Sequence, residues 1–399
     1  MDLLSYIPIL KETNPRLVLG HIRAGTAVTR AEIARVTGLH PSTITRIVAS
    51  LIEEGLVREN GERENDVGRK PIVLSVVGKA VHIIGVAIES TFVAGVLVDL
   101  AATILDKIEI PFPPDADFDV VMEKVEYVVD GLLGRAEKRK ITVVGIGAAV
   151  HGIVDSSRGL SVFAPAIGWK NVPLGQIMEQ KYGLPIRMEN NARAMALGEL
   201  WFGQGRDVQD LLAVKVGQAI GAGIIVGGQL FHGNAYSAGE IGHTTVVPDG
   251  PLCKCGNYGC LETVASIEAV TTRLRVMLKR GDAASLSALI GNNPDELSFK
   301  ALCYATACGD KFVLQMWKKA ASYLGLAIAN AINIINPAKV LIGGDILPVV
   351  DYLLPKIREI VETRVFETLK STLRIEPVGL GVDSVAIGAA TLVLKEFFE

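Results

Sequence analysis

Hydrophobic residues at helical spacing organise the first 75 residues of the chain. The clearest run has the i, i+3, i+4, i+7 spacing of a helix with one buried face, and it consists of Ile44, Ile47, Val48 and Leu51. This helix is expected to begin near Pro41, because proline is favoured in a first helical turn. A shorter helix is expected over residues 30–36, where Thr29 and Glu32 have the spacing of a capping box. Gly38 suits a sharp turn between the two, so the segment has the helix-turn-helix pattern.

The polar side of the second helix carries short hydroxyl side chains and one arginine. Such side chains suit base edges and phosphates, and the outward set is Ser42, Thr43, Thr45, Arg46 and Ser50, of which the first four are the candidate DNA contacts. Hydrophobic runs at residues 56–57 and 72–74 predict two strands around a wing loop, residues 58–71, in which Arg69 and Lys70 suit a DNA backbone. We therefore predict a winged helix-turn-helix DNA-binding domain over residues 1–75. The alternative is a helical packing module that binds no DNA.

From residue 80 onward the pattern changes to strands alternating with helices. Runs at 83–88 and 93–98 predict a hairpin, followed by a helix over 119–139, a strand over 143–150, a strand over 186–188 and a helix from Ala192. A second set follows, with strands over 211–216 and 223–226 around a glycine loop (217–223), a helix over 312–335 and a strand over 339–342. These elements predict two α/β lobes, over residues 80–195 and 196–382, with a C-terminal helix over 383–399 returning to the first lobe.

Two hairpin-led lobes resemble the actin-like ATPase and sugar-kinase architecture, which is ribonuclease H-like. The cleft between such lobes is the expected ligand site, and the second lobe is expected to carry the oligomerisation surface.

Composition and charge narrow the class of protein. The 399 residues are 49% hydrophobic and 21% charged, which is typical of a globular chain and excludes collagen-like, disordered and disulfide-scaffold proteins. The net charge of the whole chain is −3, but residues 16–58 form a basic segment with six arginines and three glutamates. The chain has neither an apolar run of about 18 residues nor an N-terminal leader pattern. We expect a cytoplasmic protein that does not enter a membrane.

Three of the five cysteines lie within eight residues. Cys253, Cys255 and Cys260, with His243 ten residues before the first, supply four soft or borderline ligands. Such a set suits a closed, tetrahedral structural zinc site rather than a catalytic one. The alternative is a group of free buried thiols. Cys303 and Cys308 lack such a context and are expected to be core residues.

The segments Glu240-Ile-Gly-His243 and Cys253-Lys-Cys-Gly-Asn-Tyr-Gly-Cys-Leu-Glu262 resemble two motifs of the ROK family (repressors, open reading frames and sugar kinases). The resemblance covers about residues 14–388, and the N-terminal domain places the chain near the repressor branch, which includes the xylose repressors. The resemblance implies zinc on the histidine and the three cysteines. It also implies sugar hydroxyls on Asn190, Asn191, Glu240, His243 and Glu262, with Gly152 beside them.

The kinases of this family use an aspartate base at the position that Asn191 occupies, and an amide cannot accept the hydroxyl proton. Their first phosphate loop, Asp-x-Gly-Gly-Thr, corresponds to residues 87–91, where Ala87 cannot orient a metal ion and Glu89 adds negative charge. Only the second loop, 217–223, keeps its glycines.

We therefore expect a sugar-responsive repressor without kinase activity, acting as a homodimer or dimer of dimers on operator DNA. A neutral monosaccharide, with xylose or glucose favoured, is expected to release it from the operator. The alternatives are an active sugar kinase with an appended DNA-binding domain, and a repressor that responds to a phosphosugar or a protein partner.

Overall fold

A computed structural model of the chain describes residues 3–25, 28–62, 71–114, 116–290 and 293–398. These residues form two units, Met1–Phe202 with Val385–Glu399, and Gly203–Ser384. Each unit has its own hydrophobic core. None of the helices in the described part of the chain combines the length and the hydropathy needed to cross a bilayer.

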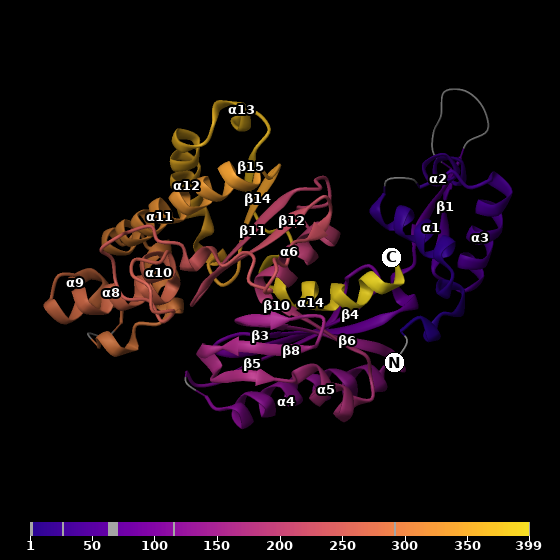
Figure 1. Cartoon of the computed structure of the whole chain (residues 1–399). Helices are drawn as coiled ribbons and strands as arrows, with labels where there is room; N and C mark the ends of the chain where they lie inside the picture. Colours follow the sequence, from indigo (N-terminus) through magenta and orange to yellow (C-terminus); the bar gives the residue numbers. More distant parts are fainter. Residues whose placement is uncertain (1–2, 26–27, 63–70, 115, 291–292, 399) are drawn as a thin grey trace. The chain divides into compact units, whose positions relative to one another are not determined.

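The first unit begins with the winged helix-turn-helix (Figure 1). Its elements are η1 (Leu3–Tyr6), η2 (Pro8–Lys11), α1 (Thr13–Ala24), α2 (Arg30–Thr37), α3 (Pro41–Glu53), β1 (Val57–Glu62) and β2 (Ile72–Val76). The capping box is confirmed, because the Thr29 hydroxyl accepts from the Glu32 N–H and the Glu32 carboxylate accepts from the Thr29 N–H. Gly38 ends α2 in the left-handed region, with φ of 69°. The four hydrophobic residues predicted for the inner face of α3 are buried, as expected.

The wing differs from the expectation in the length of its strands. β1 continues to Glu62 and pairs antiparallel with β2, so Arg58 lies in a strand opposite Ser75 and not in a loop. The strands are longer than predicted because backbone N–H and C=O groups continue to pair beyond the hydrophobic residues. The hydrophobic pattern of the sequence marks only those hydrophobic residues. Arg69 and Lys70 lie outside the described residues.

A five-stranded sheet in the order β10-β6-β3-β4-β5 forms the centre of the first unit. Its strands are β3 (His82–Ile88), β4 (Phe92–Asp99), β5 (Ile104–Pro111), β6 (Val143–Val150) and β10 (Ile186–Asn190). The predicted β3–β4 hairpin is confirmed. β3, β6 and β10 run parallel, and both Ile88 and Asn190 pair with Val150. The carboxyl ends of these three strands therefore meet at one edge of the sheet.

Helices cover both faces of this sheet. The remaining elements of the unit are η3 (Gly78–Ala80), α4 (Phe118–Lys138), β7 (Ile153–Asp155), β8 (Leu160–Ala164), η4 (Pro165–Ile167), β9 (Trp169–Val172), α5 (Leu174–Tyr182), α6 (Asn191–Phe202), α14 (Ser384–Leu394) and η9 (Lys395–Phe397). Figure 1 shows α4 and α14 on opposite sides of the strands. α14 approaches closely, since a Cβ on Gly147 would lie 1.8 Å from the Ala389 carbonyl oxygen.

An arginine helps to hold the DNA-binding part to the rest of the unit, together with the packing of η1 on β6 and η9. The guanidinium carbon of Arg23, on α1, lies 3.6 Å from the centroid of the Trp201 ring near the end of α6. Arg23 also donates to the Trp201 carbonyl oxygen at 3.2 Å, and the Phe398 ring lies 5.4 Å from the guanidinium. α1 is therefore attached by a stacked cation in addition to the connecting chain.

The second unit contains a sheet in the order β13-β12-β11-β14-β15. Its strands are β11 (Leu211–Val216), β12 (Ile220–Val226), β13 (Gln229–Leu230), β14 (Lys339–Gly343) and β15 (Arg374–Pro377). Its helices are η5 (Ile241–His243), α7 (Glu262–Ala265), α8 (Ile267–Arg280), α9 (Ala284–Leu289), η6 (Pro294–Glu296), α10 (Phe299–Ala307), α11 (Lys311–Ile335), η7 (Leu347–Val349), α12 (Val350–Arg364), α13 (Glu367–Lys370) and η8 (Gly381–Asp383).

Two expectations for this unit are wrong. The glycine loop expected over 217–223 is a turn of residues 217–219, and β12 begins at Ile220 because residues 220–225 pair with β11. Cys308 is exposed at the C-terminal cap of α10 and is not a core residue. Cys303, by contrast, is partly buried against the core.

We predict that Gly147→Ala destabilises the protein by about 3 kcal/mol or more, because the added methyl overlaps the α14 backbone. Gly134→Ala is the matched control. Gly134 lies within α4, a Cβ there would meet no neighbour within 4 Å, and alanine is expected to add about 0.5–1 kcal/mol of stability. Urea unfolding measures both, and equal stability of the two variants would contradict the packing of α14 on β6.

Candidate functional site

Polar side chains gather where β3, β6 and β10 end. Glu89 follows β3, Gly152 follows β6 by two residues, and Asn190 and Asn191 lie at the junction of β10 and α6. The in-register ends bring these residues together. Ligands of α/β proteins bind at the carboxyl ends of parallel strands, which makes this edge a candidate binding site.

Asn190 and Gly152 are directly bonded. The Asn190 amide donates to the Gly152 carbonyl oxygen at 2.7 Å, and its Oδ1 accepts from the N–H groups of Ala192 and Arg193. Gly152 has φ of 91°, and a Cβ there would lie 2.2 Å from the Phe163 carbonyl oxygen, so glycine is required. The side chain of Asn190 therefore caps α6, a role that the sequence analysis did not predict.

Asn191 is bonded to Glu89. The Asn191 amide donates to a Glu89 carboxylate oxygen at 2.9 Å, and both residues are 5% exposed. The sequence showed that Asn191 occupies the position of the kinases' aspartate base. It also showed that Glu89 adds negative charge to the segment that corresponds to their first phosphate loop. It did not pair them, because 102 residues separate the two in the chain.

A buried ion pair lies beside these asparagines. Arg193 donates from Nε to Glu189 at 2.7 Å, and both side chains are 1% exposed. Glu189 also accepts from the Ser156 hydroxyl and from the backbone N–H of Asn190. Arg193 reaches the Val154 carbonyl oxygen as well. This network fixes the strand–helix junction. Glu189 lies in β10 and Arg193 in α6, so the spacing rule for pairs on one helix could not have revealed this ion pair.

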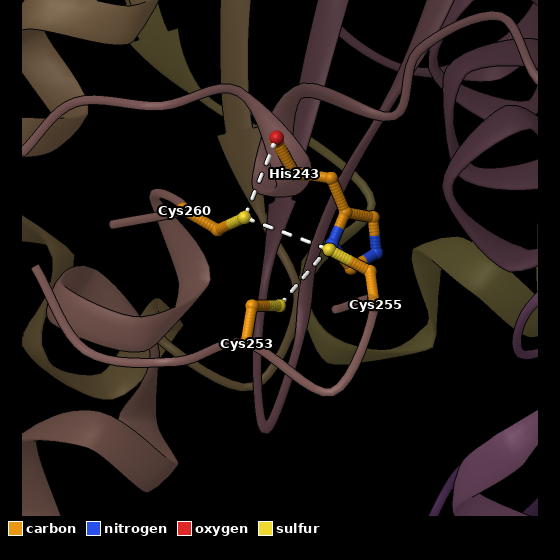
Figure 2. Close-up of side chains that lie close together, drawn as sticks. All are labelled: His243, Cys253, Cys255 and Cys260. Atoms are coloured by element: carbon orange, nitrogen blue, oxygen red, sulfur yellow. Dashed lines mark hydrogen bonds between the residues drawn. The ribbon is translucent and has the colours of Figure 1, made fainter. Parts of the chain in front are cut away.

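In the second unit, His243, Cys253, Cys255 and Cys260 come together as predicted. Their four ligand atoms lie within 4.8 Å of one another. Figure 2 shows the three sulfurs and the histidine ring converging. Cys253 Sγ lies 3.6 Å from His243 Nδ1, and Cys255 Sγ lies 3.7 Å from Cys260 Sγ. The donor set and its tight grouping fit a four-coordinate metal ion.

The loop that carries the cysteines is shaped by short backbone pairings. Thr245 pairs with Cys260, and Leu252 pairs with Tyr258. A Cβ on Gly259, where φ is 65°, would lie 1.5 Å from the Val247 carbonyl oxygen. Glycine is thus required for Cys260 to reach the cluster.

The protonation of the three thiols follows their surroundings. Burial raises the pKa of the Cys253 thiol and of the Cys260 thiol. The backbone N–H of Asn257 lowers the pKa of the Cys255 thiol. Three thiolates at this spacing repel one another, so a bound cation is the natural means of holding them deprotonated.

Glu240 and Glu262 lie on either side of the His243 ring. Glu240 Oε2 is 3.8 Å from His243 Nε2, and Glu262 Oε1 is 3.6 Å from His243 Nδ1. Glu262 Oε1 also accepts from Cys253 Sγ at 3.1 Å. The ring therefore presents Nδ1 to the cysteines and Nε2 toward Glu240, and the structure brings together the three candidate ligand residues of this unit.

On the DNA-binding part, α3 exposes Ser42, Thr45 and Arg46, whereas Thr43 is half-buried. Thr45 donates to the Pro41 carbonyl oxygen. His40, which sequence analysis missed, is the N-cap of α3. Its Nδ1 accepts from the Ser42 N–H at 3.3 Å and lies 2.7 Å from the Ser42 hydroxyl. A histidine directly before the proline of the first turn was the available signal.

Comparisons with known proteins agree with this geometry. Residues 83–396 match the ROK family, and residues 16–69 match the MarR family. The chain is 31% identical over 388 residues to the xylose repressor of Caldicellulosiruptor bescii, which covers 97% of each chain.

Two solved structures are similar. A ROK family transcriptional regulator, a homologue of the Escherichia coli MLC protein, has a TM-score of 0.80 at 27% identity and covers 100% of this chain and 97% of its own. A ROK family glucokinase from Streptomyces griseus, in complex with glucose and AMPPNP, has a TM-score of 0.70 at 30% identity and covers 78% of this chain and 98% of its own.

We predict that Arg193→Leu lowers the free energy of unfolding by about 3–5 kcal/mol, because it leaves the Glu189 carboxylate buried without its cation. Arg30→Leu is the control. It breaks the ion pair of Arg30 with Glu59, whose side chains are 29% and 42% exposed, and is expected to cost about 0–1 kcal/mol. Denaturant unfolding measures the free energy of unfolding of both variants. Equal losses would show that burial does not make the Glu189–Arg193 pair more important for stability than an exposed pair.

Proposed function

The chain belongs to the ROK family. We propose that it is a DNA-binding transcriptional repressor whose affinity for its operator is controlled by a sugar. One observation carries the proposal. A winged helix-turn-helix with an exposed, hydroxyl- and arginine-bearing helix is joined to a ROK domain that has an asparagine at the base position. The similarity to a xylose repressor over 97% of both chains supports the same combination.

We assign DNA reading to α3. Its exposed Arg46 and Thr45 are placed to contact base edges and phosphates in a major groove. Arg69 and Lys70 of the wing complete the proposed set on the adjacent backbone. The protein acts as a homodimer, or a dimer of dimers, since paired helix-turn-helix units match a palindromic operator.

We assign the binding of sugar hydroxyls to two groups of residues, one in each unit. The first group is Gly152, Asn190 and Asn191, and the second is Glu240, His243 and Glu262. Amides and carboxylates match the donor and acceptor pattern of neighbouring hydroxyls. Sugar binding shifts the population toward the state with the weaker affinity for DNA, which requires different sugar affinities in the two states. Xylose or glucose is the favoured effector.

We infer that the chain is not a sugar kinase. Asn191 donates to Glu89 and has no basic atom to take a hydroxyl proton, a function worth about 10²–10⁴ in rate. The second candidate function is a kinase with an appended DNA-binding domain, which the 30% identity to a glucokinase favours. Turnover of glucose or xylose with Mg-ATP would establish that second function.

We propose that the metal is zinc, held by His243, Cys253, Cys255 and Cys260. A site with four protein ligands has no open position, so zinc there supplies rigidity and no reaction chemistry. It ties down the segments that carry Glu240 and Glu262, which contact the same histidine ring.

We predict that Cys255→Ser removes bound zinc and lowers the midpoint temperature of unfolding by several degrees, because a structural metal contributes folding energy. Cys308→Ser is the control, since Cys308 is also exposed but lies outside the cluster. Elemental analysis should find about one zinc per chain in the wild type and in Cys308→Ser. A wild type purified without chelator that contains no zinc contradicts the assignment.

We predict that Arg46→Ala weakens DNA binding about 5- to 150-fold, equivalent to about 1–3 kcal/mol. The probe is a duplex selected from a random library by the wild type, at fixed salt concentration. Arg280→Ala, at the exposed end of α8, is the control and should bind as the wild type does. Unchanged affinity of Arg46→Ala would show that α3 is not the reading helix.

The effector is tested on the same complex. Addition of xylose, glucose or N-acetylglucosamine to the wild-type complex is expected to raise the dissociation constant for at least one of the three. Tighter DNA binding with a sugar would reverse the proposed direction. Indifference to all three, by a protein that binds DNA, would favour a phosphosugar or a protein partner as the signal.

A further inference from the structure

We propose that two exposed hydroxyl groups of α3, on Ser42 and Thr45, read bases and not phosphates, and that each selects adenine or cytosine over guanine or thymine. The inference rests on the proposed function, and it names the feature of DNA that this part of the helix recognises. It also makes His40 the residue that positions the Ser42 hydroxyl.

The hydroxyl proton of Thr45 is used within the helix. Thr45 Oγ1 lies 2.9 Å from the Pro41 carbonyl oxygen, one turn earlier. A carbonyl oxygen can only accept, so the hydroxyl is the donor. Threonine commonly bonds in this way to the carbonyl four residues before it. The lone pairs of Oγ1 remain, and the residue is exposed, so Thr45 offers an acceptor to DNA.

The hydroxyl proton of Ser42 is directed toward His40. The Ser42 N–H donates to His40 Nδ1 at 3.3 Å, which requires that this ring nitrogen carries a lone pair and no proton. Ser42 Oγ lies 2.7 Å from the same nitrogen, so the hydroxyl is the donor in that contact also. Ser42 is exposed and therefore presents acceptor lone pairs, as Thr45 does.

The orientation of the two hydroxyls limits what they can contact. Phosphate oxygens accept hydrogen bonds, so neither hydroxyl can bond to the DNA backbone without first breaking its bond within the protein. In the major groove, adenine N6 and cytosine N4 donate, whereas guanine O6 and thymine O4 accept. An oriented hydroxyl therefore bonds to adenine or cytosine and places two acceptors against each other at guanine or thymine.

Arg46 supplies the opposite chemistry on the same helix. Its guanidinium carries only donors, which suit phosphate oxygens and the acceptor edge of guanine. The exposed side of α3 thus separates donors on Arg46 from acceptors on Ser42 and Thr45. Hydroxyls that rotate freely both donate and accept, and they would not provide this discrimination.

The test uses the full chain and a duplex selected from a random library by the wild type, together with every single base-pair substitution of that duplex. Affinities are measured at fixed salt concentration for the wild type, Ser42→Ala and Thr45→Val. We expect each variant to lose about three- to tenfold discrimination at one base position of a half-site. At that position the wild type should prefer adenine or cytosine. Thr45→Ser, which keeps the hydroxyl, should keep the preference.

His40→Ala tests the positioning role. It frees the Ser42 hydroxyl to donate, so discrimination should fall at the base position that Ser42→Ala affects. The two changes together should cost no more discrimination than Ser42→Ala alone. A residue that only capped α3 would change the affinity for all duplexes alike. Ser322 on α11 donates to the Lys318 carbonyl oxygen as Thr45 does to that of Pro41, and Ser322→Ala is the control that should keep the wild-type profile.

The outcomes separate this inference from the proposed function. Unchanged discrimination in Ser42→Ala and Thr45→Val, an equal loss of affinity for every duplex, or a lost preference for guanine or thymine overturns the inference and leaves a DNA-binding repressor in place. A wild type that selects no duplex from the library overturns the proposed function and this inference with it. Thermal unfolding of each variant establishes that it is folded, and Thr45→Ala replaces Thr45→Val if valine prevents folding.

Discussion

The parallel register of β3, β6 and β10 is the constraint on which the first unit depends. The three strands end at the same level, so the residues after each strand meet at one edge. Polar groups brought together in a buried place must satisfy one another, and here they do. Asn190 bonds to Gly152, Asn191 bonds to Glu89, and Glu189 bonds to Arg193. A slip of one residue in any strand would turn these side chains to the other face of the sheet.

The candidate metal centre depends on a different constraint, because its four ligand residues must come together within one short segment of the chain. Its ligands lie within 18 residues of one another, and close backbone contacts bring the ends of this segment together. His243 connects the cysteine cluster with the carboxylate of Glu240, because Nδ1 of its ring faces the cysteines and Nε2 faces Glu240. The stability of the loop and the position of the carboxylates are thereby coupled.

The difference between local and distant pairing explains what the sequence could predict. The capping box at Thr29, the buried face of α3 and the cysteine cluster depend on residues close in the chain, and all three are confirmed. The contact between Glu89 and Asn191 spans 102 residues and depends on strand register, which hydrophobic periodicity does not encode. Gly221 was assigned to a loop for the same reason, because its pairing with β11, and not its residue type, makes it part of β12.

Helix α6 begins at Asn191, which bonds to Glu89, and ends one residue after Trp201, on which Arg23 of the DNA-binding part is stacked. Its 12 residues span about 18 Å as a single rigid rod. The DNA-binding part is thus connected to the rest of the unit by specific side-chain contacts as well as by the chain itself. A chimaera that received this part from another repressor would keep the full attachment only if the donor supplied a cation at the place of Arg23 and an N-terminal turn that packs on β6 and η9 as η1 does. Recombination among such repressors is accordingly expected to conserve the whole span from α1 to the end of α6, and to tolerate crossovers after it.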